Sequence, residues 1–102
     1  MIEYEGHAPP EGGPGTIFRV YDGKRREIVN PPRRHSPDGF QWGYGGSGPA
    51  DTAFALLREV LGFDPFPSMY QRFKFEVVAN LPNDFVITTD QIREWIRKYE
   101  NE

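Results

Sequence analysis

The sequence predicts an α+β fold, in which a small antiparallel sheet packs against about three helices. Two patterns carry this prediction. Residues 16–29 alternate on both sides of Asp22-Gly23, as in a β-hairpin, and apolar residues recur at helical spacing within residues 49–61. Aromatic residues make up 15% of the chain, which argues against disorder.

Size and charge narrow the functional classes. A chain of 102 residues fits one domain, residues 1–102. There is no cysteine, which excludes disulfides and thiolate metal sites. The formal net charge of −3 argues against nucleic-acid binding, which needs clustered positive charge. No signal peptide and no apolar run of membrane-spanning length occurs, so we expect a cytoplasmic protein without a membrane partner.

The N-terminal region contains the predicted hairpin. Residues 1–15 become rich in proline and glycine and predict a loop or flexible arm, in which Ile2 and Tyr4 could start a short edge strand. The hairpin then covers residues 16–29, because Asp22 and Gly23 both tolerate positive φ angles. The basic start of its second strand predicts a solvated edge.

Two further short strands are expected, near residues 40–42 and 85–87. In the first, alternation would place Phe40 and Trp42 on one face. The second is the continuous apolar run Phe85-Val86-Ile87.

The first helix is predicted over residues 49–61. Pro49 would take the first position, where its missing N–H costs nothing, and Ser47 or Gly48 would be the cap. Gly62 would end the helix.

Two more helices are predicted, over residues 68–80 and 89–99. Ser68 can cap the first of these. Alternating apolar residues between Phe73 and Val78 keep a strand open as the alternative. The last helix begins with a capping box formed by Thr88 and Gln91.

Segment 35–49, HSPDGFQWGYGGSGP, is the most unusual stretch of the chain. It holds five of the 11 glycines and three aromatic residues, and it leads directly into the first predicted helix. Backbone N–H groups in a glycine-rich turn at a helix N-terminus can bind an anion. Upstream cations could complete a phosphate clamp, and the aromatic side chains could stack on a ring. The candidate ligand-binding residues are therefore Arg33, Arg34, His35, Trp42, Tyr44, Gly45, Gly46, Ser47 and Gly48.

Known phosphate motifs do not fit this segment. Gly43, Gly45 and Gly48 match G-x-G-x-x-G in spacing, but the βαβ unit that this motif requires is missing. The Lys-Ser/Thr pair of a phosphate-binding P-loop is also absent. With two histidines and no carboxylate cluster, the sequence indicates neither a metal site nor a cofactor.

Each candidate also has a structural interpretation. The glycines can simply let the loop pass closely over Trp42 and the helix. Trp42 and Tyr44 can be core residues, Arg33 and Arg34 can be solvated, and His35 can be a turn residue. The sequence leaves these alternatives open.

The run from Ser36 to Ala50 resembles the signature SPxGFxWGYGGSGPAxLA of a family of small uncharacterised domains from bacteria, archaea and their phages. The resemblance extends over about residues 16–99 and includes a Phe-Lys-containing helix, Leu81-Pro82 and a closing helix with Ile92 and Trp95. Residues 8–15 depart from the pattern. The resemblance implies no reaction, but it makes a phage-encoded protein acting in the host cytoplasm a reasonable expectation.

Two functional hypotheses follow. In the first, a non-enzymatic protein binds a phosphorylated or nucleotide-like ligand at the glycine-rich loop, for example to sequester a host nucleotide signal. In the alternative, the loop and its aromatic residues bind a host defence or replication protein. An enzyme has less support, because Ser47 and His35 are the only conceivable nucleophile–base pair. Assembly into a homo-oligomer stays open.

Overall fold

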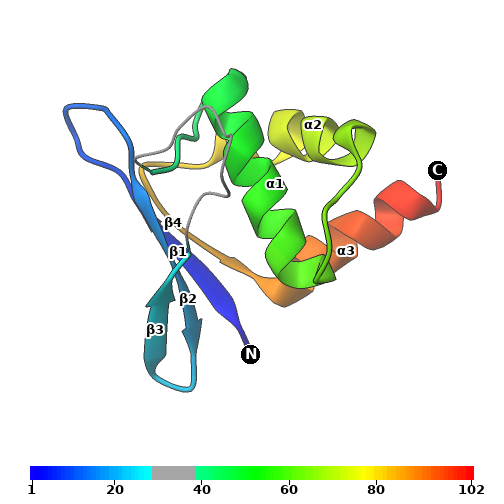
Figure 1. The fold of residues 1–102 in the computed structure, drawn as a ribbon, viewed down its shortest axis with the longest axis horizontal. Coiled ribbons are helices and arrows are strands. Elements are labelled where there is room, and N and C mark those ends of the chain that lie inside the picture. Colours follow the sequence, from blue (N-terminus) through cyan, green and yellow to red (C-terminus); the bar gives the residue numbers. More distant parts are fainter. Residues whose placement is uncertain (29–38) are drawn as a thin grey trace.

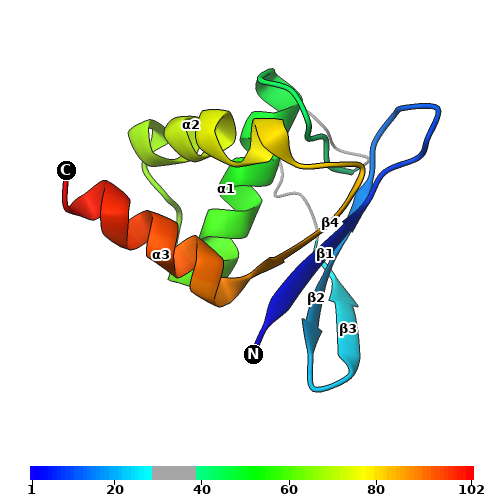
Figure 2. The ribbon, with the colours of Figure 1, turned by 180° about the vertical axis from the view of Figure 1, so that it is seen from behind.

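The computed structural model describes residues 1–28 and 39–102. In this part of the chain, four strands form one antiparallel sheet, and the helices lie on one side of it (Figures 1 and 2). The α+β fold class predicted from the sequence is confirmed. The end of the predicted hairpin at Val29 and the proline pair after it lie outside the described residues.

The sheet has the strand order β3-β2-β1-β4. Its strands are β1 (Glu3–His7), β2 (Thr16–Tyr21), β3 (Lys24–Glu27) and β4 (Asp84–Thr88). The short strand that Ile2 and Tyr4 allowed is present as β1, but its expected position at the edge of the sheet is wrong, because β1 pairs on both sides. Its second neighbour, β4, comes from the other end of the chain, and no local pattern reveals such a pairing.

The predicted hairpin is confirmed. Its turn places Asp22 at φ 53° and Gly23 at φ 75°, the left-handed region that a two-residue hairpin turn requires. The strand expected near 40–42 is reduced to a single bridge between Gly15 and Phe40. Gly43 ends the extended segment there, because its φ of 87° turns the chain toward the helices.

The first helix, α1 (Ser47–Leu61), starts two residues earlier than predicted. Its N-cap is Gly46, with extended backbone and no side-chain hydrogen bond, so neither Ser47 nor Gly48 is the cap. Gly62, at φ 82°, ends the helix as expected.

The region of residues 68–80 is helical, which settles the alternative between helix and strand. It forms α2 (Pro67–Glu76) and a short 3₁₀ turn, η1 (Val78–Asn80). Pro67, not Ser68, opens α2, because proline suits the first helical position and Phe66 is the N-cap. The last helix, α3 (Thr89–Glu100), has the predicted capping box.

Helix α1 is buried far more completely than its single apolar stripe predicts. Every residue from Gly48 to Leu57 is buried, including Asp51 and Thr52. This burial explains why small side chains are frequent in the helix.

Near its C-terminal end, α1 is tied to the sheet. The guanidinium of Arg26 in β3 donates to Glu59 at 3.0 Å. Burial raises the pKa of Tyr4 in β1, and the charge of Glu59 raises it further.

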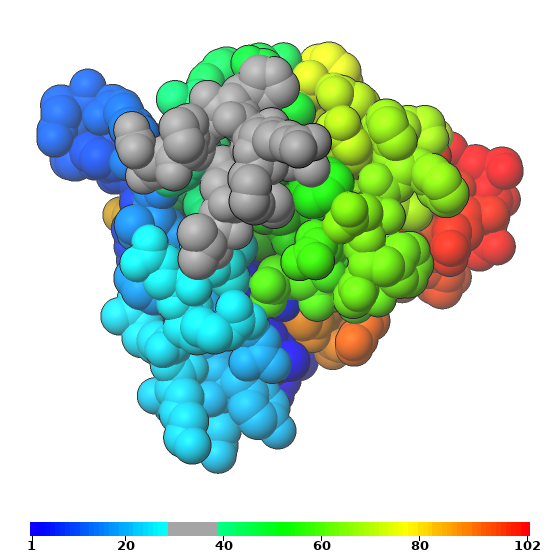
Figure 3. Space-filling view, viewed as in Figure 1, coloured from blue at the N-terminus to red at the C-terminus, as the bar shows by residue number. Residues whose placement is uncertain are grey.

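The loop between β1 and β2 projects away from the rest of the molecule (Figure 3). His7, within the segment predicted as a loop or flexible arm, is the last residue of β1 and lies 3.1 Å from a carboxylate oxygen of Asp84. Within residues 1–28 and 39–102, no helix has the length and apolar character needed to cross a membrane.

Candidate functional site

The start of α1 leaves two backbone donors without acceptors. In a helix, the first N–H groups find no carbonyl one turn earlier. Gly46 supplies no side-chain cap, and Pro49 has no N–H at all. The amides of Ser47 and Gly48 therefore form no hydrogen bond within the described residues. The positive end of the helix dipole lies at the same place.

A cavity of about 340 Å³ opens beside this helix start. Its wall combines the glycine-rich loop with α1 and α2, and includes Gly45, Gly46, Ser47, Phe54, Tyr70 and Lys74. The rings of Phe54 and Tyr70 meet edge to face, with centroids 5.5 Å apart. The cavity thus has an aromatic side and a side formed by backbone amides.

Lys74 is the most informative residue of this cavity. It lies on α2 and is only 7% exposed. Among the described residues, its ammonium forms neither a hydrogen bond nor an ion pair, and its nitrogen lies 4.1 Å from the centroid of the Phe75 ring. A buried cation is normally paired, because desolvation of an unpaired charge is costly. Lys74 can therefore supply an unused positive charge to the cavity.

A carboxylate, that of Asp51, lines the same cavity and is 3% exposed. A carboxylate has about four acceptor positions, so it can serve more than one donor. Within the described residues, the cavity consequently offers the Lys74 cation, the Ser47 amide and the Asp51 carboxylate within a small space.

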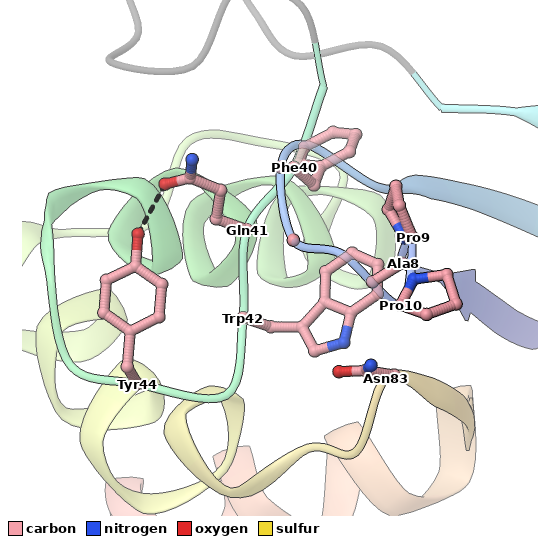
Figure 4. Close-up of a pocket in the computed structure, with 10 residues that line it drawn as sticks. Ala8, Pro9, Pro10, Phe40, Gln41, Trp42, Tyr44 and Asn83 are labelled. Atoms are coloured by element: carbon pink, nitrogen blue, oxygen red, sulfur yellow. Dashed lines mark hydrogen bonds between the residues drawn. The ribbon is translucent and has the colours of Figure 1, made fainter.

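Trp42 lies on the other side of the loop and is held in the core. Its indole N–H donates to the carbonyl of Pro82 at 2.7 Å, and its ring meets Phe85 edge to face. It is 8% exposed and lines a second cavity, of about 320 Å³, together with Ala8, Pro9, Pro10 and Asn83. In Figure 4, the indole points toward this β1–β2 loop.

Tyr44 is half exposed, lines the same cavity as Trp42 and points toward Gln41. Its hydroxyl donates to the side-chain oxygen of Gln41 at 2.5 Å (Figure 4). The backbone carbonyl of Gln41 accepts a hydrogen bond from the hydroxyl of Thr52 at 2.6 Å. Gln41 thus connects the loop to α1.

The predicted site residues are divided by this arrangement. Gly45, Gly46 and Ser47 line the cavity of Lys74, whereas Trp42 and Tyr44 line the other cavity. Gly48 is buried in the first turn of α1. The remaining three candidates, Arg33, Arg34 and His35, lie outside the described residues.

Sequence reasoning did not identify Lys74, Tyr70 or Asp51 as site residues. A signal for them exists in the spacing. Tyr70 and Lys74 are four residues apart and share one face of α2, and Asp51 follows Ser47 by four residues on α1. A lysine on the apolar face of a helix is unusual enough to indicate a role beyond packing.

Comparisons with known proteins identify a family but no function. The described residues contain no group of three or more His, Asp or Glu side chains suited to a metal ion. No curated protein and no solved structure matches the chain. The profile of a family of unknown function (DUF6166) matches residues 4–98, and the chain therefore belongs to that family.

Proposed function

We propose that this protein binds a small phosphorylated, nucleotide-like molecule in the cavity at the start of α1, without catalysing a reaction. The observation that carries the proposal is the buried residue Lys74 on the wall of a cavity that Ser47 also lines. Among the described residues, neither the Lys74 ammonium nor the Ser47 amide takes part in a hydrogen bond. An anion at this position would receive charge-assisted hydrogen bonds from both sources.

The rest of the cavity suits the rest of a nucleotide. Tyr70 and Phe54 provide a surface for a ring, and the carboxylate of Asp51 can accept hydrogen bonds from a base. This assignment moves the ring contact from Trp42 and Tyr44, which line the other cavity, to Tyr70. A volume of about 340 Å³ is at the lower end for small-molecule sites, which favours a mononucleotide over a polymer.

Further parts of the sequence hypothesis belong to the same proposal. Arg33 or Arg34 would neutralise additional phosphate charge. The biological role would be sequestration of a host nucleotide signal by a phage-encoded protein in the host cytoplasm.

Thermal unfolding with a defined set of compounds tests the proposal. The compounds are inorganic phosphate, ribose 5-phosphate, the ribonucleoside monophosphates and uncharged adenosine. A ligand at about 100 times its Kd adds about 2.7 kcal/mol of stability, so binding is detected as a rise in Tm. We expect at least one monophosphate to raise Tm more than phosphate or adenosine does. A set without any shift would refute the proposal.

Two substitutions connect this effect to the cavity. Lys74→Gln removes the cation and should abolish the Tm shift. Ser47→Glu places a carboxylate at the helix start, where it favours the helix dipole but repels an anion. Its fold should be retained while ligand binding is lost. Lys24→Gln, on the exposed strand β3, is the matched control and should bind like the wild type.

Exposed aromatic residues favour the second candidate function, binding of a host protein through the same loop. Tyr44 is 50% exposed and Phe75 is 60% exposed, and the Phe75 ring lies close to Gly45. Aromatic side chains are enriched in the cores of protein interfaces. A Tyr44→Ser, Phe75→Ser variant should lose capture of such a partner while retaining nucleotide-induced stabilisation. Equal capture by this variant and the wild type would exclude the loop as the interface.

A further inference from the structure

Among the strands that the structure describes, β4 is the last of the sheet, so one of its edges has no neighbouring strand there. The hydrogen bonds that flank it are Ala8 N–H to the Asn83 carbonyl and Thr89 N–H to the Ile2 carbonyl, both 3.0 Å. In an antiparallel pair, residues whose backbone groups bond to the neighbouring strand alternate with residues whose backbone groups point away from it. Phe85 and Ile87 therefore bond to β1, and the backbone groups of Asp84 and Val86 point outward.

An apolar groove of about 350 Å³ runs beside this edge. Its apolar lining comes from β4, α3 and the region around η1, namely Val77, Leu81, Val86, Ile87 and Trp95. Three polar residues of α3 complete its rim, Gln91, Glu94 and Lys98. Three of the apolar residues, Val77, Leu81 and Trp95, pack against the main core yet are only partly buried. The core thus extends to the surface directly beside unpaired backbone groups.

The opposite edge of the sheet is protected. Strand β3 has the sequence Lys24-Arg25-Arg26-Glu27, and all four residues are exposed. Charged side chains on an edge strand discourage pairing with another chain. Of the residues in β4, only Asp84 is charged, and Val86 is 56% exposed. The β3 edge therefore carries the charged side chains that discourage strand addition, whereas the β4 edge carries one charged residue.

We infer that β4 binds an extended segment of a partner protein, which adds to the sheet as a fifth strand and places apolar side chains in the groove. Strand addition combines main-chain hydrogen bonds with pockets for alternate side chains. A second copy of this chain is a poorer occupant. Its own β4 would present Phe85 and Ile87, which are already buried in its core and cannot fill the groove.

The charges beside the edge define the partner further. Residues of the added strand opposite Asp84, Val86 and Thr88 would lie on the open face of the sheet, together with Glu3 and Glu5. The side chain of Asp84 is 75% exposed. On the same face, His7 lies 3.1 Å from Asp84 and Arg25 lies 3.6 Å from Glu5, so three carboxylates meet one arginine and one histidine. A lysine or arginine opposite Asp84 would add to the positive side of this balance and be attracted to the exposed carboxylate. The partner segment therefore alternates apolar residues with polar ones and contains a basic residue.

Selection from a phage-displayed library of random dodecapeptides tests the inference. We expect enriched peptides to alternate apolar and polar residues and to carry a lysine or arginine. A synthetic copy of an enriched peptide should change the ¹⁵N NMR amide signals of Asp84 and Val86. It should also alter the fluorescence of Trp95 in the groove.

Val86→Pro is the decisive variant. Proline removes the outward N–H without affecting the pairing with β1, so the fold should persist. The Kd of the peptide should rise by about tenfold or more, because a main-chain hydrogen bond is lost and proline blocks the edge. Val86→Thr keeps both the N–H and the branched side chain and should bind like the wild type.

Three outcomes would overturn the inference. The first is that no peptide is enriched on the wild type relative to Val86→Pro. The second is that the enriched peptides bind both proteins equally. The third is that sedimentation reveals a wild-type dimer that Val86→Pro converts to a monomer, because a second copy of the chain would then occupy the edge.

Discussion

The side chain of Gln41 occupies the space in which a Cβ atom on Gly48 would lie, so the first turn of α1 packs directly on the glycine-rich loop. This contact gives Gly48 a structural reason to be glycine, separate from any ligand. Gly48→Ala should destabilise the protein by about 1–3 kcal/mol, since the methyl group would overpack the contact.

The double variant Gln41→Ala, Gly48→Ala provides the control for this prediction. Without the Gln41 amide, alanine should be tolerated better, because it favours a helix over glycine by about 1 kcal/mol. Urea unfolding of the four proteins gives the coupling free energy. Additive effects of the two substitutions would contradict the proposed contact.

A second glycine, Gly6, should be equally sensitive. Gly6 in β1 is paired with Phe85 in β4, and the Phe85 ring lies over the position that a Cβ atom would take. Gly6→Ala should cost about 1–3 kcal/mol in urea unfolding, because the ring must leave its place in the core. Gly45→Ala is the matched control, since it meets only the exposed ring of Phe75. Similar losses for both variants would be inconsistent with this explanation.

Trp42 should contribute to stability more than to ligand binding. Trp42→Phe removes the hydrogen bond to Pro82 and part of the contact with Phe85, and we expect a loss of about 2 kcal/mol in the free energy of unfolding. The Tm shift caused by a bound monophosphate should be unchanged. If stability were retained and the ligand shift were lost, the ring contact would return to Trp42.

Glu76 should make stability depend on acidic pH. Hydrogen bonds from Arg72, at 2.8 Å, and from the Trp95 indole, at 2.9 Å, hold the pKa of Glu76 below its ordinary value of 4.5. A depressed pKa contributes stability that is present above the unfolded pKa and is lost as pH falls through the folded pKa. Wild-type Tm should therefore fall more between neutral pH and about pH 3 than the Tm of Glu76→Gln.

The size of this effect should be modest, because the Glu76 side chain is exposed to solvent. Glu100→Gln, at the end of α3, serves as the comparison, and its Tm should depend on pH as the wild-type Tm does. Parallel pH curves for wild type and Glu76→Gln would remove Glu76 as the cause.

Local chemistry explains which elements were predictable. Asp22-Gly23 and the capping box of Thr88 and Gln91 determine their own backbone geometry, so the hairpin and α3 were predicted closely. The start of α1 was not, because a glycine N-cap leaves no side-chain signal. The central position of β1 depends on β4, far away in the sequence.

The candidate site was predictable only on one side. The glycine-rich loop was recognisable from Gly45, Gly46 and Ser47, which do line the cavity of Lys74. The opposite wall comes from α2, and the approach of Lys74 to the loop results from packing of two helices. Because Lys74 is far from the loop in the sequence, it was not recognised as part of the site. Trp42 is close to the loop in the sequence and was expected to stack on a ligand, but it is packed in the core.

The position of β1 between β2 and β4 has a consequence for folding kinetics. The central strand is synthesised before both of its partners, and one of them, Asp84–Thr88, follows much later, with 77 positions between the paired residues His7 and Asp84. Closure of so long a loop is entropically costly and slows folding. Until then, β1 exposes one row of hydrogen-bonding groups in the nascent chain. We therefore expect the sheet to complete only after β4 has left the ribosome, with β1 as the site most prone to misassociation before that moment.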